Sequence, residues 1–420
     1  VRCCANRTAA VLREREALPD SFFAEFRRRL WLPPRAHGDM IEGRTVSFLE
    51  LFYDLVYVVV IARAAHTLAS DINWRTVGEF FVIFGLIWIA WVNGTLYHEL
   101  HGREDVRTRV FVFIQMLLLA MLAVFTDEAA ASSGKQFAIV YAVHQAVLWW
   151  LWFSVRLQDT DEYMNVTRRY LTAMMASIGL MVVSTIVPVD VRVALWVLLV
   201  LLWFGSGAVL SRSEALETGI RASDSMVERF GLFVIIVLGE VVVGVVDGLS
   251  EADHNSRSIA TGMIGLCVGF AYWWTYFDFV GRRLPMDRGP ARTAWTFLHF
   301  PVTSSIAAAG AAMVSLIEHA SDEHTPAATA WLLAGSVAFG LSAMILKTRT
   351  LEDYNRTPTI YRPLTRAMAS AAAIAPTTAI WAPAPWLLAL SLVVILLGVW
   401  LVAVKRWLRL DDPDTTQPKQ

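Results

Sequence analysis

Two acids and a tyrosine recur at one-turn spacing in the first hydrophobic stretch of this 420-residue chain. Glu50, Asp54 and Tyr57 lie three or four residues apart, so a helix places them on one stripe with Ile61. The stretch reads VSFLELFYDLVYVVVIARAAHTL and is long enough to cross a bilayer, which takes about 20 apolar residues. Each charged residue costs roughly 2.5–3.5 kcal/mol to insert, so the stripe must face a bundle interior or a wet cavity.

Two interpretations of this stripe stay open. The acids can hold two helices together through a hydrogen bond or ion pair, or they can line a water-filled site or ion path. The second interpretation is favoured because two carboxylates on one stripe need more than one partner. Since two close carboxylates disfavour double ionisation, we expect at least one of them to hold a proton or a bound cation.

Other polar residues also fall within or beside predicted spans. Glu240 lies deep in the seventh hydrophobic stretch, where a carboxylate must be paired or protonated. Arg63 lies nearly opposite the acidic stripe of its own helix, so it either snorkels to the interface or pairs with Glu240. His299 precedes Pro301, a residue that frees a backbone carbonyl. Glu228 and Arg229, at the start of the seventh span, are further candidate charge partners.

The composition assigns the chain to the membrane class. Hydrophobic residues make up 56% of the positions and charged residues 17%, against about 25% charged in soluble domains. We therefore predict an all-α membrane protein with about 12 transmembrane helices. The hydrophobic windows are 46–68, 78–97, 108–126, 137–157, 170–187, 191–210, 229–248, 258–280, 293–317, 327–346, 366–382 and 386–407, and the eleventh is the weakest because proline interrupts it.

The basic residues predict the orientation and the segments of the chain. If the N-terminus is cytoplasmic, inside segments hold 31 of the 36 Lys and Arg, outside loops hold four, and Arg63 lies within a span. Because basic residues stay on the cytoplasmic side, we expect both termini to be cytoplasmic in a bacterial inner membrane. The expected segments are a basic, partly amphipathic N-terminal segment (1–45), a first six-helix half (46–210), a cytoplasmic linker (211–228), a second six-helix half (229–407) and a polar tail (408–420).

The two halves also resemble each other in sequence. ELFYDLVYVVV from Glu50 aligns with ERFGLFVIIVL from Glu228, and WVNGTLYHE ends the second span as YWWTYFDF ends the eighth. Six-span halves of equal orientation imply a pseudo-two-fold axis along the membrane normal, with the first and seventh helices near the centre. This similarity favours two six-helix repeats.

Several function classes lack a signal in the sequence. The three cysteines have no metal-ligand spacing, and no HExxH, P-loop, GxGxxG or GxSxG motif is present. A net charge of −1 gives no reason to expect nucleic acid as a partner. We therefore expect no metal and no cofactor, with the lipid bilayer as partner; the sequence predicts no oligomeric state.

Four segments carry a family resemblance. They are ELFYDLVYVVVIARAAHTL, ERFGLFVIIVLGEVVVGV, WWTYFD and HFP, and together they resemble the bacterial low temperature requirement protein A (LtrA) family over nearly the whole span 46–406. The chain departs from the family at Ser225, where many members have a histidine. The resemblance implies a polytopic inner-membrane protein named for growth in the cold, and it implies no defined activity.

The ELFYD segment is also similar to the Phe-Ser-Asp first-span motif of a potassium-channel family built from six-span repeats. This similarity favours an ion path, so the leading hypothesis is a transporter or channel for a small cation or proton. The alternatives are an integral-membrane enzyme acting on lipid or isoprenoid-linked substrates, and a membrane scaffold or sensor without turnover.

Overall fold

The computed structural model describes residues 24–39, 44–210 and 222–409. This part of the chain is helical and contains no named strand; two residues, Pro285 and Leu351, form an isolated bridge. The prediction of an all-α membrane protein is therefore confirmed. The first 23 residues of the basic N-terminal segment, most of the linker and nearly all of the polar tail lie outside the described residues.

The described residues contain twelve helices of 19 to 28 residues, three short ones, and a helical stretch at 24–29. The long helices are α2 (Phe48–Ser70), α3 (Trp74–His101), α4 (Val106–Val124), α5 (Gly134–Arg156), α6 (Asp161–Ser184), α7 (Val189–Leu210), α9 (Asp224–Glu251), α10 (Ser256–Tyr276), α12 (His299–Glu318), α13 (Ala327–Thr348), α15 (Pro358–Trp381) and α16 (Pro385–Trp407). The short ones are η1 (Phe277–Gly281), α11 (Gly289–Phe297) and α14 (Glu352–Arg356).

Nine spans in the described chain are long and apolar enough to cross a membrane. The helices α2, α6 and α15 are not among them. Their polarity has different sources: α2 carries two acids and a base, α6 begins with DEYMNVTRR, and α15 begins with PTIYRPLTR. The number of twelve membrane crossings therefore stays a prediction.

Capping side chains set the starts of the two central helices. Ser47 forms a capping box with Glu50, and Ser223 accepts a hydrogen bond from the backbone of Met226. Since α9 begins at Asp224, the last five residues of the segment 211–228, predicted as a cytoplasmic linker, are helical.

The weakest predicted window, 366–382, belongs to a longer helix than expected. α15 has 24 residues and continues through Pro363 and Pro376. Its hydrophobic window is short because its first turns are polar.

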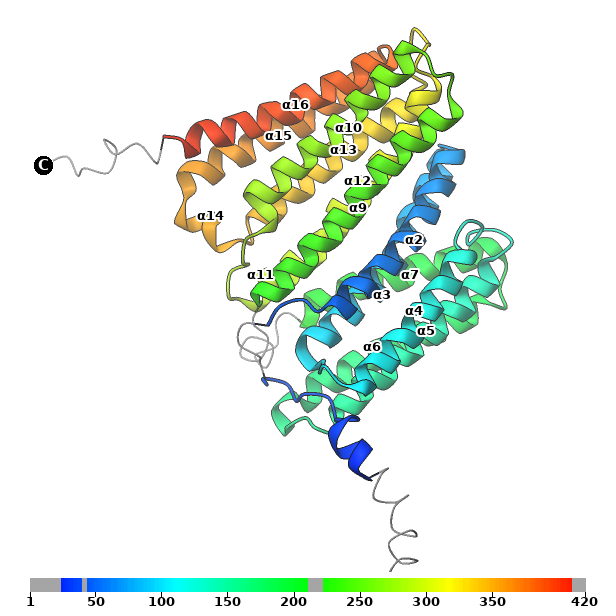
Figure 1. The fold of residues 1–420 in the computed structure, drawn as a ribbon, viewed down its shortest axis with the longest axis vertical. Coiled ribbons are helices and arrows are strands. Elements are labelled where there is room, and N and C mark those ends of the chain that lie inside the picture. The colour runs from blue at the N-terminus through cyan, green and yellow to red at the C-terminus, as the bar shows by residue number, and fades with distance from the viewer. Residues whose placement is uncertain (1–23, 40–43, 211–221, 410–420) are drawn as a thin grey trace, which may run out of the picture.

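The two halves pack their helices in the same pairwise order (Figure 1). In the first half α2 contacts α3 and α4, α4 contacts α5, α5 contacts α6, and α7 contacts both α6 and α3. In the second half α9 contacts α10 and α12, α12 contacts α13, α13 contacts α15, and α16 contacts both α15 and α10. This match is what a six-helix repeat would produce.

The halves meet through α2, α3 and α7 of the first half and α9, α11 and α12 of the second, with α7 in contact with α11. α2 contacts both α9 and α12, and α12 also contacts α3; Figure 1 shows α2 and α9 facing each other across the middle of the molecule. Within the second half, α9 and α12 approach so closely that a Cβ added at Gly244 would lie 2.1 Å from the carbonyl oxygen of Gly310. Small residues permit such backbone contact between membrane helices. The first and seventh long helices thus lie at the centre of the described bundle.

Candidate ion-pair site between the two halves

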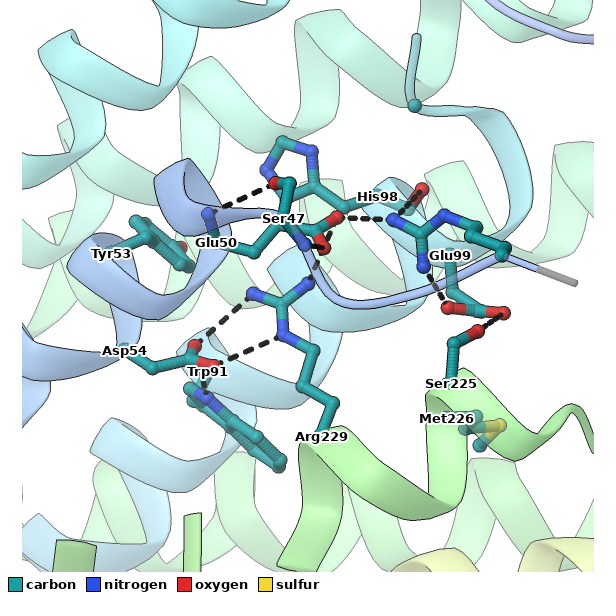
Figure 2. Close-up of polar contacts among 12 residues, drawn as sticks. Ser47, Glu50, Tyr53, Asp54, Trp91, His98, Glu99, Ser225, Met226 and Arg229 are labelled. Atoms are coloured by element: carbon teal, nitrogen blue, oxygen red, sulfur yellow. Dashed lines mark hydrogen bonds and ion pairs between the residues drawn. The ribbon is translucent and has the colours of Figure 1, made fainter. Parts of the chain in front are cut away.

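Arg229 of α9 reaches across to the acidic stripe of α2 (Figure 2). Its Nε donates to Oδ2 of Asp54 over 3.2 Å, and its Nη2 donates to Oδ1 over 3.1 Å. The guanidinium is fully buried, and Asp54 is 1% exposed. This side-on, two-bond geometry is the strong form of an arginine–carboxylate pair, and it joins the two halves of the protein.

A tryptophan of α3 fixes the orientation of the same carboxylate. Trp91 Nε1 donates to Oδ1 of Asp54 over 2.9 Å. The indole stacks on Phe233 of α9 with ring centroids 4.0 Å apart and planes inclined by 20°. Asp54 therefore receives hydrogen bonds from both sides of the interface, so three helices position this one side chain.

Glu50 lies one turn before Asp54 and continues the charge network. Its Oε1 lies 3.6 Å from Nη1 of Arg229 and forms an ion pair with Arg44. Its Oε2 accepts the backbone N–H of Ser47 over 3.1 Å. Among the described residues, Nη1 of Arg229 makes no hydrogen bond, so this arm of the guanidinium is held to Glu50 by the ion pair alone.

Arg44 extends the network to the end of α3. It forms a second ion pair with Glu99, and Glu99 accepts hydrogen bonds from the hydroxyls of Ser223 (2.5 Å) and Ser225 (2.8 Å). Positive and negative groups thus alternate from Asp54 through Arg229, Glu50 and Arg44 to Glu99. We expected Glu50 or Asp54 to hold a proton or a cation. That expectation did not consider that one guanidinium could lie close to both acids, as that of Arg229 does.

Two tyrosines of α2 lead away from the ion pair. The hydroxyls of Tyr53 and Tyr57 lie 3.0 Å apart, and Tyr53 donates to Oε1 of Gln115 on α4 over 3.0 Å. The guanidinium carbon of Arg229 lies 6.0 Å from the centroid of the Tyr53 ring. Both tyrosines are fully buried, so they form a polar row within the bundle.

Glu240 lies on α9 beyond this row. It follows Arg229 by eleven residues, a rise of about 16 Å along a helix. The residue is 3% exposed, and its Oε1 has no hydrogen-bond partner among the described residues. A buried carboxylate of this kind is expensive in a membrane unless it holds a proton or a ligand.

The structure places Arg63 away from Glu240. Arg63 lies on an exposed face of α2 and binds Oδ2 of Asp127 over 3.0 Å, with 52% and 36% of the two side chains exposed. The alternative of an Arg63–Glu240 pair was therefore wrong, because the arginine faces outward and has a nearer acid. Glu228 is also exposed, so of the adjacent Glu228 and Arg229 only the arginine reaches the acidic stripe.

His299 lies in a separate polar cluster of the second half. Its Nδ1 donates to the carbonyl oxygen of Trp295 over 2.8 Å, and its ring lies 4.5 Å from that of Phe230. Lys347 of α13 belongs to the same cluster, with Nζ 4.0 Å from the centroid of the Trp295 ring. Since Phe230 also contacts Trp91, aromatic rings separate this cluster from the ion pair.

A polar segment before α2 closes one end of the bundle. Arg35 donates to the carbonyl oxygens of Glu99 (2.6 Å) and Gly102 (2.9 Å), and burial lowers the pKa of its guanidinium. The same segment contacts the loop before α6, where Asp159 accepts hydrogen bonds from His37 (2.6 Å) and Thr167 (2.5 Å). Burial alone would raise the pKa of Asp159, but these hydrogen bonds outweigh it, so the pKa is lowered.

Comparison with known proteins gives the family. The sequence profile of the bacterial low temperature requirement A protein (LtrA) matches residues 45–401. The chain belongs to the LtrA family. It is 26% identical over 282 residues to Uncharacterized protein RA0937 of Rhizobium meliloti (strain 1021). That alignment covers 62% of this chain and 66% of the relative, slightly less than two thirds of its length. No solved structure matches.

For this member of the LtrA family, the site contains residues that the sequence did not single out. Trp91 and Glu99 both lie in WVNGTLYHE, a segment that carries the repeat similarity. The sequence alone therefore placed them at the end of the second span, but not beside the acidic stripe. Arg44 counted only as one of the basic residues before the first span. What joins them to the acidic stripe is tertiary contact, which residue spacing does not reveal.

Proposed function

We propose that this protein is a transporter or channel for protons or a small cation, with the Asp54–Arg229 pair as the element that responds to the ion. The observation that carries the proposal is the position of this pair. It is buried, and it joins α2 to α9, two of the helices through which the halves contact each other. In transporters built from repeats, coupling ions bind at such an interface.

Stability gives little reason for a buried pair at this place. Removing two charges from water costs about as much as their attraction returns, so well-packed apolar residues are often equally stable. In a bilayer, intramembrane acids and bases mark ion paths and proton relays. The pair is thus better explained by a function in which its charge changes.

The mechanism follows from competition between the ion and Arg229 for the carboxylate of Asp54. A proton or cation that neutralises Asp54 removes the attraction for Arg229, and Nη1 of the freed guanidinium already faces Glu50 at 3.6 Å. Arg229 then turns from one acid to the other. Because Glu50 lies one turn before Asp54 on the same helix of the first half, this exchange moves the ion pair between the halves by one turn of α2 and so permits the halves to shift against each other.

The remaining polar groups supply a route toward the far end of α9. The hydroxyls of Tyr53 and Tyr57 extend from the ion pair, and Glu240 offers a further carboxylate about 16 Å along the helix. We propose that an ion passes between these carboxylates. With both termini in the cytoplasm of a bacterium, Glu50 and Asp54 would be the inner acids and Glu240 the outer acid.

Ion flux into proteoliposomes tests the proposal. Wild-type protein, Asp54→Asn and the control Asp127→Asn are reconstituted, and uptake of protons, Na⁺ and K⁺ is measured separately. Asp127→Asn removes an acid from an exposed ion pair with Arg63 and should leave uptake unchanged. Asp54→Asn should abolish it. Absence of uptake of all three ions by the wild type refutes the proposal and favours a scaffold, a sensor or a lipid-modifying enzyme.

A further inference from the structure

A polar pocket lies at the end of the bundle where α2 and α4 begin, the end predicted to be cytoplasmic. Its volume is about 540 Å³, and its walls come from the segment before α2, the end of α3, the loop after it and the first turns of α2 and α4. We call it the arginine pocket because Arg44, Arg103 and Arg109 line it. Ligand sites in proteins measure about 300–1,000 Å³, so this pocket can hold a molecule larger than an ion.

Two of these arginines have guanidinium nitrogens that are free to bind a ligand. Arg109 is exposed, and its side chain makes no hydrogen bond or ion pair among the described residues. Arg103 donates through Nε to the carbonyl oxygen of Pro33 over 3.0 Å, while its Nη2 lies 3.8 Å from Oδ2 of Asp39, too far for a hydrogen bond. Since 38% of the Arg103 side chain is exposed, both arginines offer accessible donors at this pocket.

The acids at the arginine pocket do not cancel these two charges. Glu50 lines the pocket but already forms an ion pair with Arg44. Glu104 also lines it, and it is exposed, as is Asp39, so water and salt screen their effect on a bound anion. The two free guanidinium groups therefore favour an anionic ligand. Arginine binds a phosphate group especially well, because two parallel N–H groups can reach two of its oxygens.

Exposed apolar side chains lead away from the arginine pocket along both helices that begin there. α2 and α4 contact each other, and on each helix the exposed apolar residues recur every three or four positions and so share one face. The face on α2 consists of Phe48, Phe52, Leu55 and Val59, and that on α4 consists of Val110, Phe113, Leu117 and Met121. The first face begins with a residue that lines the pocket, and the second begins directly after Arg109. A ligand with an anionic head and apolar chains matches this arrangement.

We propose that the arginine pocket binds the phosphate of an anionic phospholipid, with Arg103 and Arg109 donating to its oxygens and the acyl chains lying along α2 and α4. Basic pockets between membrane helices on the cytoplasmic side bind anionic lipid headgroups. A soluble phosphate compound offers the same oxygens but leaves the apolar faces uncovered, which favours the lipid. This binding does not depend on ion transport, so the two proposals can succeed or fail separately.

Comparison of three ligands separates the lipid from other sources of phosphate. Dioleoyl phosphatidylglycerol, dioleoyl phosphatidylcholine and glycerol phosphate are each titrated against the full chain in detergent micelles, and native mass spectrometry measures the Kd. Phosphatidylglycerol should bind about tenfold more tightly than phosphatidylcholine, because the choline group offsets the phosphate charge. Glycerol phosphate should bind at least about tenfold more weakly than phosphatidylglycerol, because it has no acyl chains to bury.

Variants that remove one charge identify the residues. Arg103→Gln and Arg109→Gln should each weaken phosphatidylglycerol binding about fivefold, and Glu104→Gln should strengthen it. Arg366→Gln is the matched control, since Arg366 is exposed near the start of α15 and does not line the pocket, and it should leave binding unchanged. The proposal is overturned if phosphatidylglycerol binds no more tightly than either comparison ligand, if neither pocket arginine matters more than Arg366, or if Glu104→Gln weakens binding.

Discussion

Replacing Arg229 by methionine tests the energetics of the ion pair. The substitution leaves Asp54 buried with Trp91 as its remaining donor, while Glu50 keeps Arg44. The cost therefore comes mainly from one uncompensated carboxylate. Removal of one partner from a buried pair costs about 3–5 kcal/mol, and we expect Arg229→Met to lower the free energy of unfolding by that amount.

The double variant Arg229→Met/Asp54→Leu separates charge from packing. It removes both charges and fills the space with apolar groups, so its stability should return to within about 1 kcal/mol of wild type. The free energies are measured by unfolding in SDS titrations of mixed micelles. As a control, Arg63→Met breaks the exposed pair with Asp127 and should cost less than about 1 kcal/mol. A loss below 1 kcal/mol for Arg229→Met, or a double variant as unstable as the sum of the single ones, would refute this reasoning.

Four further predictions follow from individual residues. Gly244→Ala should lower the unfolding temperature, because the added Cβ meets a backbone carbonyl at 2.1 Å, whereas Gly239→Ala, with nothing within 4 Å, should not. Glu240→Gln should reduce ion flux and leave folding intact, as measured on the same proteoliposomes. The lowered pKa of Asp159 means that its ionised form stabilises the fold above the unfolded pKa of about 4 and that this stabilisation is lost as pH falls through the folded pKa. Asp159→Asn should therefore cost about 1–2 kcal/mol at pH 7 and progressively less below pH 4, as measured by unfolding at each pH. A single cysteine near Glu128, in a background without native cysteines, should react with an impermeant reagent from outside the cell.

The acidic stripe was predictable because the cost of burying charge in a membrane and the period of the helix point to the same face of α2. Charged residues are so expensive in a membrane helix that Glu50 and Asp54 had to face protein, and the helical period places Tyr57 with them. The choice between Glu228 and Arg229 was not predictable. Adjacent residues of a helix point about 100° apart, so only one can face α2, and the position of the partner helix determines which.

The helices differ in how well hydropathy predicts them. The apolar stretch of α16 is evident, while α6 and α15 contain polar first turns and α15 also contains two prolines. Contacts with neighbouring helices keep such segments helical, and a single-sequence hydropathy scan does not include those contacts. The same limitation explains why Arg44 was missed: its two acidic partners, Glu50 and Glu99, lie on different helices.

The distance between the halves, measured as the charge of Asp54 changes, is the most direct test of the proposed mechanism. Spin labels at positions 71 and 253, just after α2 and α9 end, report this distance by double electron–electron resonance. We expect the distance distribution of the wild type to change as pH is lowered, and Asp54→Asn to show the low-pH distribution already at neutral pH. An identical distribution for both proteins across the whole pH range would contradict the release of Arg229 as the step that lets the halves move.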